Sequence, residues 1–94
     1  MPYCTIVEFE WNESLDRERF AGTLDSAGAG QAVPEGRLSK IAGIDEVGAR
    51  VIEVWRSGED ARKFAEQSAP SWSAVQMPAP TRVLGFEVTS YVVS

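Results

Sequence analysis

The stretch Val51-Ile52-Glu53-Val54-Trp55-Arg56-Ser57 decides the fold of this chain. Four of its first five residues are β-branched or aromatic, which is typical of a strand. Ser57 then serves as a helix N-cap, with Asp60 three residues later at the spacing of a capping box. The segment therefore predicts a strand that passes directly into a helix from Gly58 to about Ser68, which Pro70 ends.

The pattern continues outward from this junction as further strands and one more helix. Alternating, β-rich segments predict the other strands, and apolar residues at helical spacing after a cap at Ser14 predict the first helix. We expect an α+β domain with a four-stranded antiparallel sheet in the strand order 4-1-3-2. The predicted strands cover 3–11, 37–44, 49–55 and 82–93, and the first helix covers 15–26.

Length and composition indicate one globular domain over residues 1–94. An apolar fraction of 44% and a charged fraction of 24% are ordinary for folded proteins. No apolar run approaches the roughly 20 residues that a membrane span requires. The first residues form no basic and apolar targeting segment, so we expect a cytoplasmic location.

Charge and the missing histidine exclude several classes of function. The net charge is −5, with 14 acidic and 9 basic residues, and the bases are scattered rather than clustered as nucleic-acid binding requires. Without histidine, catalytic triads, histidine-ligated iron or haem, and histidine-containing zinc sites are impossible. Cys4, the single cysteine, is expected to be a small buried hydrophobe. We therefore expect no metal and no cofactor.

Both faces of the predicted sheet carry apolar residues, although two helices can cover only one of them. A second subunit is the simplest cover for the other face, so we expect a homodimer. The long last strand could also reach the partner's sheet. The alternative is a monomer with a large ligand on its open face.

Glu53 has two interpretations. If residues 45–48 form the hairpin turn, Ile44 pairs with Ala49, and counting back places Lys40 directly opposite Glu53. Glu53 then forms a structural ion pair with Lys40 across the two strands. The functional interpretation is a carboxylate poised in an apolar pocket for acid/base chemistry.

Carboxylates recur at equivalent positions of neighbouring strands. On each of three strands, the alternate residues that point to one side are a mixture of polar and apolar types. These mixed sides contain Glu8, Glu53 and Glu87. Acids gathered on one face are a common source of a general acid or base near neutral pH. The alternative is that Lys40, Arg37 or a second subunit neutralises them. The face predicted from these mixed sides contains Glu8, Glu53, Trp55, Glu87, Thr89 and Tyr91.

Large apolar side chains form a candidate wall for a flat aromatic ligand, because rings stack on indole. The alternative for each is ordinary core packing. Tyr91 could donate a hydrogen bond to a bound carbonyl or phenolate, or could be a half-buried strand aromatic. The candidate wall residues are Trp55, Trp72, Phe64 and Met77.

These features together resemble the dimeric α+β barrel superfamily that includes the antibiotic biosynthesis monooxygenases. The resemblance is carried by strand 3–11, the Val54–Ser57 junction with Trp55, Phe64-Ala65, the prolines at 70, 78 and 80, and Phe86-Glu87-Val88. It implies a ferredoxin-like homodimer that binds hydrophobic small molecules between sheet and helices. Some such proteins oxidise polycyclic phenols with O₂ alone, and others cyclise or isomerise polyketide-like or lactone substrates. The chain departs from the pattern where relatives carry a pocket asparagine and a second-strand histidine.

We therefore expect a homodimeric barrel that acts on a hydrophobic aromatic or polyketide-like molecule by cofactor-independent acid/base chemistry, as a cyclase or isomerase. The alternatives are a cofactor-free monooxygenase of the antibiotic biosynthesis type and a non-catalytic ligand-binding or structural dimer. The expected catalytic residues are Glu53, Glu8 and Tyr91. The expected ligand-binding residues are Trp55, Trp72, Phe64, Met77, Thr89, Glu87 and Lys40.

Overall fold

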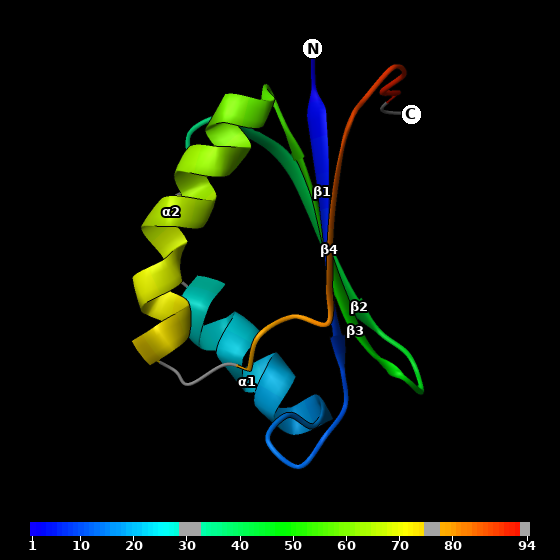
Figure 1. Cartoon of the computed structure of the whole chain (residues 1–94), viewed down its shortest axis with the longest axis vertical. Coiled ribbons are helices and arrows are strands. Elements are labelled where there is room, and N and C mark those ends of the chain that lie inside the picture. Colours follow the sequence, from blue (N-terminus) through cyan, green and yellow to red (C-terminus); the bar gives the residue numbers. More distant parts are fainter. Residues whose placement is uncertain (29–32, 75–77, 93–94) are drawn as a thin grey trace.

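A computed structural model describes residues 1–28, 33–74 and 78–92, with the side chains of 23–28 and 71–74 excepted. Both helices lie on one side of the sheet and the other side is open (Figure 1). The predicted α+β, ferredoxin-like β-α-β-β-α-β fold is confirmed. No helix within these ranges is long and apolar enough to cross a membrane. The elements are β1 (Tyr3–Glu10), α1 (Arg17–Gly28), β2 (Arg37–Ile44), β3 (Gly48–Trp55), α2 (Gly58–Ala74) and β4 (Arg82–Glu87).

The sheet has the predicted order, β2-β3-β1-β4, and every neighbouring pair is antiparallel. The predicted β2–β3 register is also confirmed, because Ile44 lies opposite Ala49 and Lys40 lies opposite Glu53. The register shifts between Arg37 and Ser39. This bulge places Arg37 opposite Trp55 and turns its side chain to the side of the sheet that faces the helices.

The apolar core lies between the sheet and α1. Phe9 and Phe20 pack with their ring centroids 6.1 Å apart, and Phe20 is only 2% exposed. Trp11 meets Phe20 edge-on and donates from its indole Nε1 to the Asp45 carbonyl oxygen at 3.0 Å. The indole thereby ties the β2–β3 hairpin to the end of β1. The core cluster comprises Phe9, Leu15, Phe20, Ala49 and Val51.

The turn between β2 and β3 is organised by the Asp45 carboxylate. Its Oδ1 accepts hydrogen bonds from the backbone N–H groups of Val47 at 2.8 Å and Gly48 at 2.9 Å. The Gly48 bond, followed by the Val47 bond, lowers the pKa of Asp45. The turn that sets the register of the whole hairpin therefore depends on an ionised side chain.

Asp45→Ala is expected to destabilise the fold at neutral pH, because two backbone donors lose their acceptor. Since the folded pKa is depressed, the contribution of Asp45 is fully present above the unfolded pKa of about 4 and is lost as pH falls through the folded pKa. Urea denaturation of both proteins at about pH 7 and about pH 3 measures this. An unchanged difference between wild type and variant at the two pH values contradicts it.

The predicted cap of α2 is confirmed. Ser57 Oγ accepts a hydrogen bond from the Asp60 N–H at 3.2 Å and donates to Asp60 Oδ2 at 3.0 Å. Arg56 Nε donates to the same carboxylate at 3.1 Å, and this bond lowers the pKa of Asp60. At α1, the cap is Asp16 rather than the predicted Ser14, because Asp16 Oδ1 accepts from the Arg19 N–H at 2.8 Å.

Most predicted element ends lie within two residues of the observed ones, but those of α2 and β4 are wrong. The helix α2 continues through Pro70 to Ala74, although an interior proline lacks one backbone donor and its ring crowds the carbonyl of the preceding turn. The strand β4 ends at Glu87, opposite Tyr3, the first residue of β1. One further bond joins the Val88 N–H to the Pro2 carbonyl oxygen at 2.8 Å, and beyond it β1 offers no residue to pair with.

Candidate functional site

Two cross-strand rows on the helix-facing side of the sheet carry polar side chains. We call them the polar rows. They lie beneath α2, whose Phe64 packs on Trp55 and whose Gly58 lies against the ring of Tyr3. The row beyond them is apolar and contains Ala42, Val51, Val7 and Val83. From β2 to β4, the polar rows run Arg37, Trp55, Tyr3, Glu87 and Lys40, Glu53, Thr5, Gly85.

Glu53 is the buried charged residue of the polar rows, with 8% of its surface exposed. Arg37 Nη1 donates to Glu53 Oε2 at 3.3 Å, and the two side chains are 18% and 11% exposed. A buried carboxylate requires such a partner. Lys40, the partner predicted from the register, lies opposite Glu53 but is exposed and forms no ion pair with any described residue. The bulge explains why Arg37 replaces Lys40 as the partner of Glu53, since it brings Arg37 to the same side of the sheet.

Trp55 is 1% exposed and fully packed. Its ring lies 5.0 Å from the ring of Phe64, and its Nε1 donates to Thr5 Oγ1 at 3.2 Å. In this structure Trp55 and Phe64 therefore pack against each other as core residues, as in the alternative interpretation given above. The indole, itself part of the polar rows, orients the hydroxyl of Thr5, which lies directly across from Glu53.

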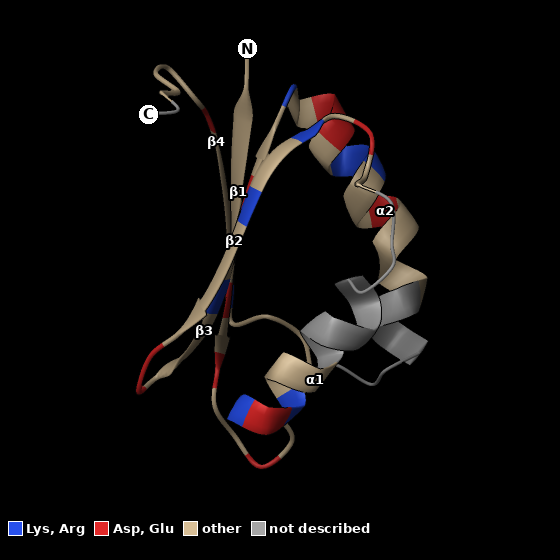
Figure 2. Cartoon of the chain, turned by 180° about the vertical axis from the view of Figure 1, so that it is seen from behind, with Lys and Arg blue, Asp and Glu red and all other residues tan. Residues whose placement is uncertain are grey.

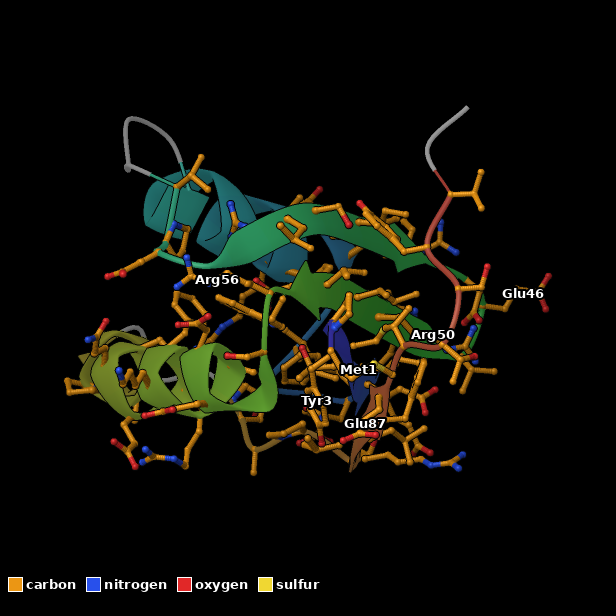
Figure 3. All side chains as sticks on the ribbon, turned by 90° about the horizontal axis from the view of Figure 1, so that it is seen from above. Met1, Tyr3, Glu46, Arg50, Arg56 and Glu87 are labelled. Carbon is orange, nitrogen blue, oxygen red and sulfur yellow. The ribbon has the colours of Figure 1, made fainter. Side chains whose placement is uncertain are left out.

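Tyr3 is a residue of this site that the sequence analysis did not select. Its hydroxyl lies directly over Gly85, where any Cβ would collide with it. Figure 3 shows Tyr3 beside Glu87, the last residue of β4. Tyr3 is half-buried, and its hydroxyl has no hydrogen-bond partner among the described residues. Two features of the sequence indicate Tyr3: it alternates with Thr5 along the first strand, and the last strand carries a glycine, Gly85, which pairs with Thr5.

Glu8 lies on the opposite, open face, so the prediction that it shares a face with Glu53 is wrong. Because Thr5 pairs with Glu53, the odd-numbered residues of β1 face the helices and the even-numbered ones face away. Arg50 Nε donates to Glu8 Oε2 at 2.8 Å, and Arg82 Nε lies 3.8 Å from Oε1. These side chains line an open hollow of about 250 Å³ at the hairpin end of the sheet, where their charges neutralise one another.

The remaining predicted site residues are not gathered at Glu53. Thr89 and Tyr91 lie beyond the end of β4 and are exposed, so their predicted place on the sheet is wrong. Glu87 is exposed at the β4 edge. The Trp72 side chain and Met77 lie outside the described residues. Among the residues described, no three cysteine, aspartate or glutamate side chains are grouped to hold a metal ion.

Comparison with known proteins gives the fold. No protein-family model matches the sequence, and no curated protein matches it. Solved structures do match over almost the whole chain. A protein of Chloroflexus aurantiacus described as an antibiotic biosynthesis monooxygenase is 18% identical, with 100% of each chain covered and a TM-score of 0.64.

Two further structures are similar at 14% identity. The ActVA-Orf6 monooxygenase of Streptomyces coelicolor, in complex with nanaomycin D, has a TM-score of 0.71, with 98% of this chain and 91% of that chain covered. The hydroxynitrile lyase of Passiflora edulis has a TM-score of 0.70, with 98% and 97% covered. The chain has the ferredoxin-like fold of antibiotic biosynthesis monooxygenase-like proteins. The fold implied by the sequence resemblance is thus confirmed.

Proposed function

We propose that this protein binds a small, flat, hydrophobic molecule over the polar rows and transforms it by acid/base chemistry without a cofactor. The observation that carries the proposal is Glu53, a buried carboxylate held by Arg37 on the helix-covered side of the sheet. A carboxylate fixed in a largely dry environment is suited to accept and return a proton.

We propose that a ligand approaches Glu53 from the β2 edge. Lys40, Ala42 and Ile44 lie on the helix-facing side of β2 and are nevertheless exposed. By contrast, Val51 and Ala49, their neighbours on β3, are buried. The helices therefore cover the centre of the sheet and leave its β2 margin open, with apolar side chains beside the charged ones.

The atoms of the polar rows support distinct roles in such a reaction. Arg37 holds Glu53 Oε2, whereas Oε1 accepts no hydrogen bond from a described residue and can take a proton from the ligand. The hydroxyls of Thr5 and Tyr3 can donate to the oxygen on which negative charge then develops. Trp55 and Phe64, packed against each other between the sheet and α2, exclude water from that side of the site.

A cofactor-free oxygenation is the second candidate reaction. It is favoured by the likeness to the nanaomycin D-bound monooxygenase, whereas the likeness to a hydroxynitrile lyase favours proton transfer. Both reactions begin with removal of a proton from a flat substrate, so the same residues serve either one.

A synthetic probe, 1,8-dihydroxyanthrone, distinguishes the candidates because its methylene carbon both exchanges protons and reacts with O₂. We expect the protein to accelerate deuterium exchange in D₂O under argon, followed by NMR. Accelerated anthraquinone formation with O₂ consumption would favour the oxygenase, whereas accelerated exchange without faster anthraquinone formation in air favours the acid/base enzyme. Thermal stabilisation by the probe without either reaction would favour a non-catalytic binding protein.

We also propose that the protein is a homodimer that buries its open sheet face. One cross-strand row on that face is entirely aliphatic and comprises Ile41, Ile52, Ile6 and Leu84. The adjoining row adds Val54, Cys4 and Phe86. Ile41 and Phe86 remain 65% and 49% exposed, and a continuous apolar face of this kind marks an interface. A second copy covers it symmetrically.

Ile41→Glu is expected to weaken this dimer by about tenfold or more, because a carboxylate would be buried without a partner. Val33→Glu is the matched control, since Val33 is similarly exposed at 70% but lies in the loop before β2. Light scattering over a concentration series measures the dissociation. Wild type that stays monomeric at micromolar concentration contradicts the dimer itself.

A further inference from the structure

We propose that the ligand of the polar rows carries a negatively charged oxygen, as a carboxylate, enolate or phenolate, and that Lys40 binds it at the β2 edge. The inference rests on the proposed function and adds the chemical class of the ligand. It derives from how the charges of the covered side of the sheet are distributed.

Lys40 is a cation without an ion pair among the described residues. The charged neighbours along its strand and across it are already matched, because Arg37 pairs with Glu53 at 3.3 Å. The other lysine of the chain, Lys63, lies 3.7 Å from Glu59 on α2. Figure 2 shows basic positions along β2 and mixed acidic and basic positions along α2. Within the described part of this chain, whose net charge is −5, Lys40 is thus an unmatched cation beside the candidate site.

No other charge of the polar rows can neutralise Lys40. The remaining acid, Glu87, lies on β4 at the opposite edge, about 14 Å away at about 4.8 Å per strand. Arg62 is paired with Glu66 within α2, and Arg56, just before the helix, is paired with Asp60 of α2. The β2 edge is therefore positive and the β4 edge negative, which orients an anionic ligand with its charged end at β2.

The bulge in β2 is the cause of the unmatched charge. Directly opposed residues of opposite sign normally pair across strands, and Lys40 lies directly opposite Glu53. The register shift brings Arg37 onto the same side, and Arg37 takes the carboxylate instead. Cross-strand Cβ atoms are about 5 Å apart. A ligand oxygen bound by Lys40 therefore lies beside the same cross-strand row as Glu53.

A matched pair of probes tests the charge requirement directly. Binding of 2-naphthoate and of its neutral counterpart 2-naphthamide is measured by titration calorimetry for wild type, Lys40→Gln and Lys63→Gln. We expect wild type to prefer the anion by about fivefold, as for a solvent-accessible charge pair. We expect Lys40→Gln to lose that preference while binding the amide unchanged, and Lys63→Gln to retain it. Added salt reduces the preference.

Protection from amine acetylation, read by mass spectrometry, provides a second measurement. Naphthoate is expected to slow labelling of Lys40 and to leave Lys63 unaffected. Equal affinity for the two probes, or an unchanged preference in Lys40→Gln, overturns the anion proposal while leaving a binding site for flat molecules. Absence of binding by either probe overturns both the anion proposal and the proposed function.

Discussion

Glu53→Gln is expected to lower the rate of deuterium exchange on 1,8-dihydroxyanthrone by about a hundredfold, because an amide cannot accept the proton that a general base removes. Glutamine keeps the shape of the side chain and can still meet Arg37 through its amide oxygen. Exchange measured by NMR under argon reports the proton-transfer step without interference from O₂.

The same substitution is expected to cost about 2 kcal/mol of stability, since the Arg37 guanidinium loses its carboxylate in a mostly buried position. The matched control is the double variant Arg37→Gln with Glu53→Gln, which removes both charges. We expect it to recover part of the stability and none of the activity. If exchange recovers together with stability, Glu53 has a structural role only.

Gly48→Ala is expected to destabilise the fold by about 3 kcal/mol. A Cβ at this position would lie on the carbonyl oxygen of Phe9, a backbone atom of the neighbouring central strand that cannot move aside alone. Gly43→Ala is the matched control, because Gly43 is also a strand glycine yet has nothing within 4 Å of its Cβ position. Urea denaturation measures both variants.

We expect Gly43→Ala to change the free energy of unfolding little or to raise it slightly, since alanine restricts the unfolded chain. Equal losses in the two variants would mean that the close approach between Gly48 and β1 does not limit the structure. A Gly48→Ala protein that does not fold at all agrees with the prediction, provided that Gly43→Ala folds normally.

Local sequence determined the elements and one register. The number of residues in the 45–48 turn sets Ile44 opposite Ala49, and pairing then places Lys40 opposite Glu53 without further information. Ser57 and Asp60 cap α2 through contacts three residues apart. Such features depend on hydrogen bonds and periodicities within a short segment, which is why they could be predicted.

Tertiary structure decided which residues share a site. Both faces of the sheet are apolar enough that alternation alone did not assign Glu8, and only its pairing with β3 shows that it faces away from Glu53. The end of β4 depends on where β1 begins, which excluded Thr89 and Tyr91. Tyr3 entered the site because Gly85, distant in sequence, leaves room for its hydroxyl.

The partner of Glu53 shows most clearly which features follow from local sequence and which from tertiary structure. The sequence by itself determined that a lysine lies across from this carboxylate, because hairpin register follows from turn length. It did not determine the ion pair, because a one-residue bulge at the start of β2 turns Arg37 to the same side and satisfies the charge first. A bulge arises where two strands pair, so only the assembled sheet decides which cation is paired with Glu53 and which is not.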